Sequence, residues 1–278
     1  MSQNYTLEPG YIDGALGSLF TMHYRPNKLT EDTECFVVAP SFAEEMNRCR
    51  YMCTMLAQSL AENHYAYLSI DPFGTGDSEG DFIDADWQQA CADIITAVGY
   101  AKKLGYKKIS LLGIRLGALQ VMQIVSSIPS LTRIVFWQPV VSGKTTLVQF
   151  LRIKIAASIG RNEKPGTIDE FDAQVAQGDS IEVAGYDVSP GLYQGIKSAN
   201  LKDHLDFTSV PIAWFTTLNS VERKTPRAEL DVMDKWKQAG AHIDHNIVIG
   251  PSYWQVHERT LVPELVTATV NYILDNKL

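Results

Sequence analysis

The sequence predicts an α/β fold in which a doubly wound, mostly parallel sheet carries a helical insertion. Short β-rich runs alternate with helical stretches through the first half of the chain, and the alternation resumes near residue 210. Between residues 143 and 205 it stops. Parallel strands need crossover helices, so this alternation is typical of a sheet covered on both faces. We therefore expect one domain over residues 1–278, with a cap or lid insertion at 143–205.

Six runs of strand length make up the predicted sheet. They are residues 35–39, 66–70, 108–112, 133–137, 210–216 and 242–249. Stretches with helical periodicity or length separate or follow them, at residues 47–62, 85–104, 118–122, 227–239 and 263–275. The order of strands and helices indicates a layered sheet rather than a helical bundle.

The insertion contains two helical patterns around a polar stretch. The first pattern, residues 145–159, mixes apolar with basic side chains. The second begins at Ser189-Pro190, an N-cap residue followed by proline at the first helical position. We expect both helices to form the cap, while the mixed first helix leaves open a docking surface for a partner or a membrane face.

Composition limits the partners. The net charge is −8 and no run of lysine or arginine occurs, which argues against nucleic acid, because phosphate binding needs a basic surface. The first residues lack a basic segment followed by an apolar one, and no stretch approaches about 18 apolar residues, so we expect no membrane span and a cytoplasmic protein. The oligomeric state is left open, a homodimer included.

The sequence predicts no metal site and no cofactor. Cys49 and Cys53 lie one helical turn apart but have no further ligands nearby. His242 and His245 are three residues apart on a predicted strand, so alternation points them to opposite faces. The four cysteines fit reduced thiols better than a disulfide framework.

The segment Gly113-Ile114-Arg115-Leu116-Gly117 stands between a predicted strand and a predicted helix. This is the position of the G-x-S-x-G turn, in which hydrolases hold a nucleophilic serine. Arg115 occupies the central position. A guanidinium stays protonated and has no lone pair to attack a carbonyl carbon, so the ordinary nucleophile is missing.

Several segments, in the right order, resemble the α/β-hydrolase family. The stretch DPFGTGDS at residues 71–78 is similar to the family's D-x-x-G-x-G-x-S loop, and the elbow, the insertion and His257 follow it. The segments PSFAEEMNRCR (40–50), GIRLGA (113–118), FWQPVVSG (136–143), EVAGYDVSP (182–190) and GPSYWQ (250–255) resemble the exosortase A system-associated hydrolase 2 group. The resemblance implies an α/β-hydrolase fold and a link to exosortase-associated processing of surface polysaccharide or protein.

The family's serine, histidine and acid cannot all be carried over. His257 stands where the resemblance implies the base. In the loop after the strand at 210–216, where the family has its acid, Glu222 is the ionisable option, and the alternative acid position holds Gln138. Ser41, in the loop that supplies an oxyanion-hole amide in this family, is a candidate for a displaced nucleophile.

An arginine at the elbow allows two arrangements. Together with the Leu116 N–H and the amino end of the following helix, the guanidinium could form a receptor for an anion. Alternatively Glu44 or Glu45, in the loop that borders the elbow in this fold, supplies the counter-charge, and the ion pair closes the old active site.

Three functions therefore remain open. The first is a structural ion pair in a closed site. The second is a non-catalytic protein that binds a small acyl or anionic ligand. The third is a divergent esterase- or thioesterase-type hydrolase of small acyl substrates that uses His257 and a relocated nucleophile such as Ser41.

Overall fold

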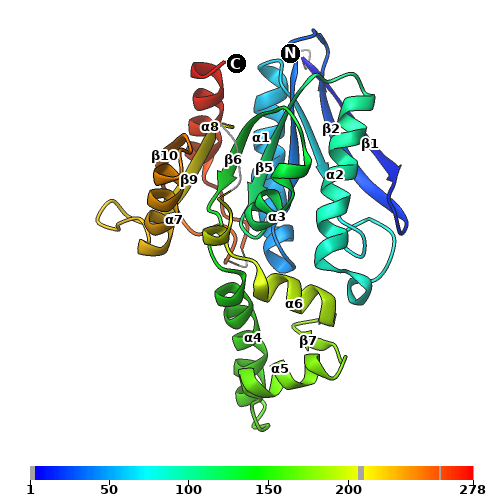
Figure 1. Ribbon diagram of the computed structural model, residues 1–278, viewed down its shortest axis with the longest axis vertical. Helices are drawn as coiled ribbons and strands as arrows, with labels where there is room; N and C mark the ends of the chain where they lie inside the picture. Colours follow the sequence, from blue (N-terminus) through cyan, green and yellow to red (C-terminus); the bar gives the residue numbers. More distant parts are fainter. Residues whose placement is uncertain (1–3, 206–209, 257, 278) are drawn as a thin grey trace.

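A central sheet organises the computed structural model, which describes residues 4–205, 210–256 and 258–277 (Figure 1). In these ranges eight strands form the sheet, in the order β1-β2-β4-β3-β5-β6-β9-β10. The bounds are β1 Tyr5–Asp13, β2 Ser18–Pro26, β3 Glu34–Ala39, β4 Ala66–Ile70, β5 Lys108–Ile114, β6 Leu131–Trp137, β9 Ile212–Leu218 and β10 Ile243–Ile249. From β4 to β10 all neighbours are parallel, whereas β2 is antiparallel to both β1 and β4.

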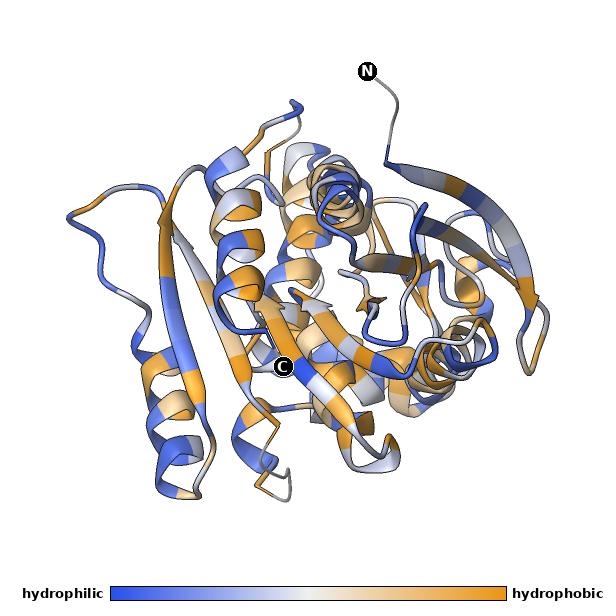
Figure 2. Ribbon diagram, turned by 90° about the horizontal axis from the view of Figure 1, so that it is seen from above, coloured by the Kyte–Doolittle hydropathy of each residue, from blue (hydrophilic) through white to orange (hydrophobic). Residues whose placement is uncertain are grey.

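Helices cover both faces of this sheet. The larger ones outside residues 143–205 are α1 Glu44–Glu62, α2 Trp87–Lys103, α3 Gly117–Ile124, α7 Arg227–Gln238 and α8 Pro263–Asp275. Neighbouring residues of β3 enter two different cores: Val37 belongs to the core that also holds residues of α2, α3 and α7, while Phe36 and Val38 belong to the core that holds residues of α1 and α8. The central strands are therefore apolar on both sides, as buried parallel strands must be (Figure 2).

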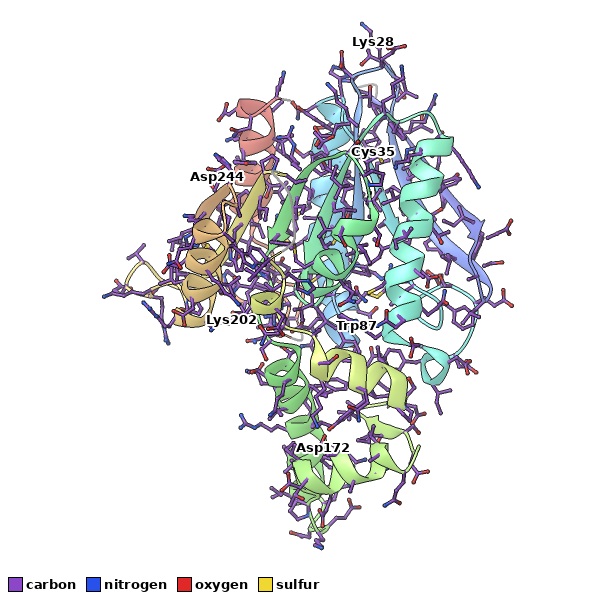
Figure 3. All side chains as sticks on the ribbon, in the orientation of Figure 1. Lys28, Cys35, Trp87, Asp172, Lys202 and Asp244 are labelled. Carbon is purple, nitrogen blue, oxygen red and sulfur yellow. The ribbon has the colours of Figure 1, made fainter. Side chains whose placement is uncertain are left out.

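Residues 143–203 form a separate group of elements beyond the carboxyl ends of the strands (Figure 1). The group contains α4 Gly143–Gly160, α5 Ile168–Ala176, the hairpin of β7 Ile181–Val183 and β8 Tyr186–Val188, and α6 Pro190–Ser198. Ser189 caps α6 through the Leu192 N–H, as the sequence predicted. Asp172, labelled in Figure 3, lies on α5. It accepts hydrogen bonds from Tyr193 and Lys197 of α6 and so joins the two helices.

The predicted fold class is confirmed, and each predicted strand overlaps an observed one. The hairpin β1-β2 was not predicted, and neither were α5, inside the polar stretch, and the hairpin β7-β8, which follows that stretch. The first helix begins at Glu44 rather than at residue 47. No helix in the described part of the chain is long and apolar enough to cross a membrane.

Candidate functional site at the strand–helix elbow

The chain makes a complete elbow around Arg115. Its φ of 55° is left-handed, and its backbone N–H donates to Trp137 O on β6, so the residue is held between β5 and α3. Gly117 allows the close approach of the loop after β3, because a Cβ there would lie 2.1 Å from Ala39 O. The strained turn that normally displays a nucleophile is thus present with a different side chain on it.

The Arg115 guanidinium has its partners inside the protein. Its Nε donates to Glu45 Oε2 and its Nη2 to Glu45 Oε1, each at 3.1 Å, which is a bidentate pair. Its Nη1 donates to Gln138 O at 3.1 Å, and the Trp254 ring lies 4.8 Å from Cζ. Arg115 is 9% exposed. The charge at the elbow is therefore neutralised by the first turn of α1.

Glu44, the other candidate partner of Arg115, points away from the elbow and contacts Tyr186 and Arg48. Its carboxylate is exposed, accepts from the Tyr186 hydroxyl of β8 at 3.1 Å, and lies 3.6 Å from Arg48 Nε. Of the two glutamates that the sequence offered, Glu45 contacts Arg115 and Glu44 contacts the 143–203 segment. Leu116 is buried at the start of α3 and borders a cavity of about 40 Å³ beneath α6.

Glu222 and Gln138 occupy the two positions that the sequence offered for a catalytic acid. Among the described residues, neither position places a carboxylate beside a histidine. Glu222 is exposed on the loop after β9, and a hydrogen bond with Ser220 keeps its pKa below the ordinary value. Gln138 is buried; its Oε1 accepts from the Thr217 N–H at 2.6 Å and its Nε2 donates to Glu229 Oε1 at 3.2 Å. His257 lies outside the described residues, so its predicted role stays a prediction.

Glu229 is a buried carboxylate that the sequence analysis missed. Besides Gln138, the Trp214 Nε1–H and the Thr216 hydroxyl donate to it, at 2.9 and 2.6 Å. Burial raises its pKa, partly offset by these hydrogen bonds and by Arg115. A signal existed: Glu229 extends the apolar stripe of Val232, Met233 and Trp236 on α7 by one turn. Its three donors come from three different side chains, so Glu229 ties α7 to β9 and to the residue that follows β6.

Ser41 is the second residue after β3 and is 5% exposed. Its Oγ has no hydrogen-bond partner of ordinary geometry among the described residues, and it lies beside the Cys49 thiol. The residue borders both the small cavity beneath α6 and a larger one of about 190 Å³ under α1.

The glycine-containing loop at residues 71–78 is held together by Asp71. Its carboxylate accepts from Arg50 Nη2 at 2.8 Å and from the Asp77 N–H at 3.0 Å. The Ser78 hydroxyl donates to the Asp71 carbonyl, which closes the loop. These contacts hold the loop in place, and its residues form part of the walls of both cavities.

The sequence and the fold are similar to those of known α/β-hydrolases. Residues 31–205 match the family model described as serine aminopeptidase, S33. No curated protein matches the chain.

Solved structures of similar shape include ferulic acid-bound Est1E from Butyrivibrio proteoclasticus, with a TM-score of 0.71, 17% identity, and 96% of this chain and 98% of that chain covered. A thermostable carboxyl esterase from Bacillus coagulans in complex with glycerol has a TM-score of 0.67 and 11% identity, with 98% of this chain and 99% of that chain covered. The α/β hydrolase GrgF from Penicillium sp. sh18 has a TM-score of 0.65 and 16% identity, with 98% of this chain and 99% of that chain covered. At these identities the likeness shows the fold.

The family match covers more than half of the chain, and the elbow, its glycines and the strand order agree with it. The chain belongs to the serine aminopeptidase S33 family of α/β-hydrolases, with arginine where that fold holds its serine.

Proposed function

We propose that this protein binds a small acyl compound without hydrolysing it. The observation that carries the proposal is the bidentate pair between Arg115 and Glu45 at the elbow. A group that cannot attack a carbonyl fills the nucleophile's place, and a carboxylate holds it there. Arg115 is then a plug that closes the old catalytic centre.

The ligand would occupy the cavity beneath α6, with the 143–205 insertion acting as a cap. Its walls are mostly apolar and include Phe42, Phe82, Leu116 and Leu192. At about 40 Å³ the cavity holds little more than one water, so binding requires the cap to shift outwards. The apolar walls favour an acyl chain.

An anionic head group at Arg115 is the less favoured form of this proposal. Glu45 already accepts from two of the guanidinium nitrogens, so an anion would have to displace it and leave that carboxylate unpaired. An uncharged ester or amide avoids this cost.

We extend the proposal to the cellular setting on the sequence resemblance alone. Residues 40–50 and 250–255 resemble the exosortase A system-associated group, which suggests a cytoplasmic role beside exosortase-linked surface polysaccharide or protein processing. The protein would act as a monomer or a homodimer.

Turnover and binding can be measured together. 4-Nitrophenyl butyrate should release nitrophenol no faster with the protein than in buffer. Methyl butyrate should raise the melting temperature, and Leu192→Phe, which narrows the cavity, should weaken its binding at least fivefold. Ile159→Phe, on the exposed side of α4, is the matched control and should bind like wild type. Turnover by wild type, or equal binding by both variants, would contradict the proposal.

A divergent hydrolase is the second candidate, favoured by one observation. The buried Ser41 Oγ lacks an ordinary partner and borders both cavities. In this case Ser41 would be the nucleophile and His257 its base, with the substrate again a small ester or thioester.

A further inference from the structure

We propose that a second small molecule, uncharged and mainly apolar, binds in the cavity between α1 and the sheet. This α1 cavity has a volume of about 190 Å³. Its walls include Met22 of β2, Val38 of β3, Tyr67 of β4, Ile114 of β5, and Cys49 and Cys53 of α1. It shares Pro40, Ser41 and Met46 with the cavity beneath α6 but extends along the opposite face of the sheet. The inference stands whether or not the cap cavity binds an acyl compound.

Two buried hydroxyl groups in the wall indicate a ligand with a hydrogen-bonding group. Tyr67 is 1% exposed and Ser41 is 5% exposed. Neither the Tyr67 hydroxyl nor Ser41 Oγ has a partner of ordinary geometry among the described residues; each lies beside a thiol, which is a weak partner. Buried polar atoms in native proteins nearly always have a hydrogen-bond partner, because a buried donor or acceptor without one destabilises the folded state. A hydroxyl or carbonyl oxygen of a ligand would supply it.

The charge around the cavity argues against an ionised ligand. Arg50 and Asp71, both in the wall, neutralise each other at 2.8 Å. Burial raises the pKa of Cys53 to about 11, and that of Cys49 well above its usual range, so both thiols stay neutral. A carboxylate or an ammonium group would find no free counter-charge in the described wall.

The volume sets the size of the ligand. An apolar protein cavity of about 150 Å³ admits benzene, so about 190 Å³ suits one aromatic ring or a short chain with one polar group. A phenol-sized alcohol or ketone meets the conditions of size, polarity and charge.

Three probes that share a toluene skeleton separate the conditions of polarity and charge. We expect p-cresol to bind, toluene to bind about fivefold more weakly because it lacks the hydroxyl, and p-toluate, which is ionised at pH 7, to show no binding. Titration calorimetry gives the affinities. Tyr67→Phe should weaken p-cresol about fivefold, whereas Tyr65→Phe, the control two residues away and outside the wall, should leave it unchanged.

Several results would overturn this inference. Absence of p-cresol binding at millimolar concentration would mean that the cavity holds only water. Equal affinities of Tyr67→Phe and Tyr65→Phe for p-cresol would show that the Tyr67 hydroxyl does not bind the ligand. If Leu192→Phe weakened p-cresol and Tyr67→Phe did not, the ligand would be in the cap cavity instead. Should Tyr67→Phe fail to fold by circular dichroism, Ser41→Ala takes its place, with the same expected weakening. Because Ser41 borders both cavities, Leu192→Phe must then leave p-cresol binding unchanged, and weakening by both variants would contradict the inference.

Discussion

At the scale of single residues, Arg115 changes what the elbow can do. A serine there would be small and neutral, and a histidine would activate it. Arginine brings a permanent charge to a place that is nine-tenths buried, and that charge must be neutralised by the protein or by a ligand. Glu45 does so from the first turn of α1, where two N–H···O contacts fix the geometry.

The strength of this pair can be measured by a double-mutant cycle in urea unfolding. Arg115→Leu should lower the free energy of unfolding by about 3 kcal/mol, because it leaves the partly buried Glu45 carboxylate unpaired. Adding Glu45→Leu should restore most of that loss. The exposed pair Arg161–Glu163 is the control, and its coupling should stay below about 1 kcal/mol. Additive effects at Arg115 and Glu45 would contradict a paired plug.

The sequence could predict part of this site. It indicated the elbow and its arginine, and it offered Glu44 and Glu45 as partners because their loop borders the elbow in this fold. It could not choose between them, because the choice depends on the residue at which α1 begins. The helix begins at Glu44, so that Glu45 faces the elbow and Glu44 faces β8. Glu229 on α7 was missed because its donors come from β9 and from the residue after β6, and only the fold brings these three segments together.

At the scale of elements, the turn from β5 into α3 depends on contact with the loop after β3. Gly117 lies against Ala39 O and Pro40 O, where a Cβ would come within 2.1 and 2.7 Å of these atoms. Backbone atoms cannot move aside as a flexible side chain can, so the elbow has little tolerance at this position.

Gly117→Ala should therefore lower the melting temperature and cost about 1–3 kcal/mol, as overpacking in a tight interior does. Gly99→Ala, inside α2 with nothing within 4 Å of a Cβ, should instead stabilise the protein by up to about 1 kcal/mol. Calorimetry on the two variants separates the close approach from ordinary helix propensity. Equal behaviour of the two would show that the elbow does not need this contact.

At the scale of the whole molecule, hydrophobic pattern predicted the parallel part of the sheet well. The strands β3, β4, β5, β6 and β9 are largely buried and read as mostly apolar runs, and helices separate them along the chain as the alternation predicted. The hairpin β1-β2 lies at an edge, where exposed and buried polar residues interrupt the run. Strands of three residues, such as β7 and β8, are too short to show a period.

The central claim is that the elbow of this α/β-hydrolase holds a neutralised arginine and that no serine takes over the chemistry. Intact mass spectrometry after incubation with a fluorophosphonate tests it most directly, because the reagent adds covalently to an activated serine. The account predicts an unchanged mass for wild type and for Ser41→Ala. A wild-type adduct that maps to Ser41 and is lost in Ser41→Ala would contradict it and establish the relocated nucleophile.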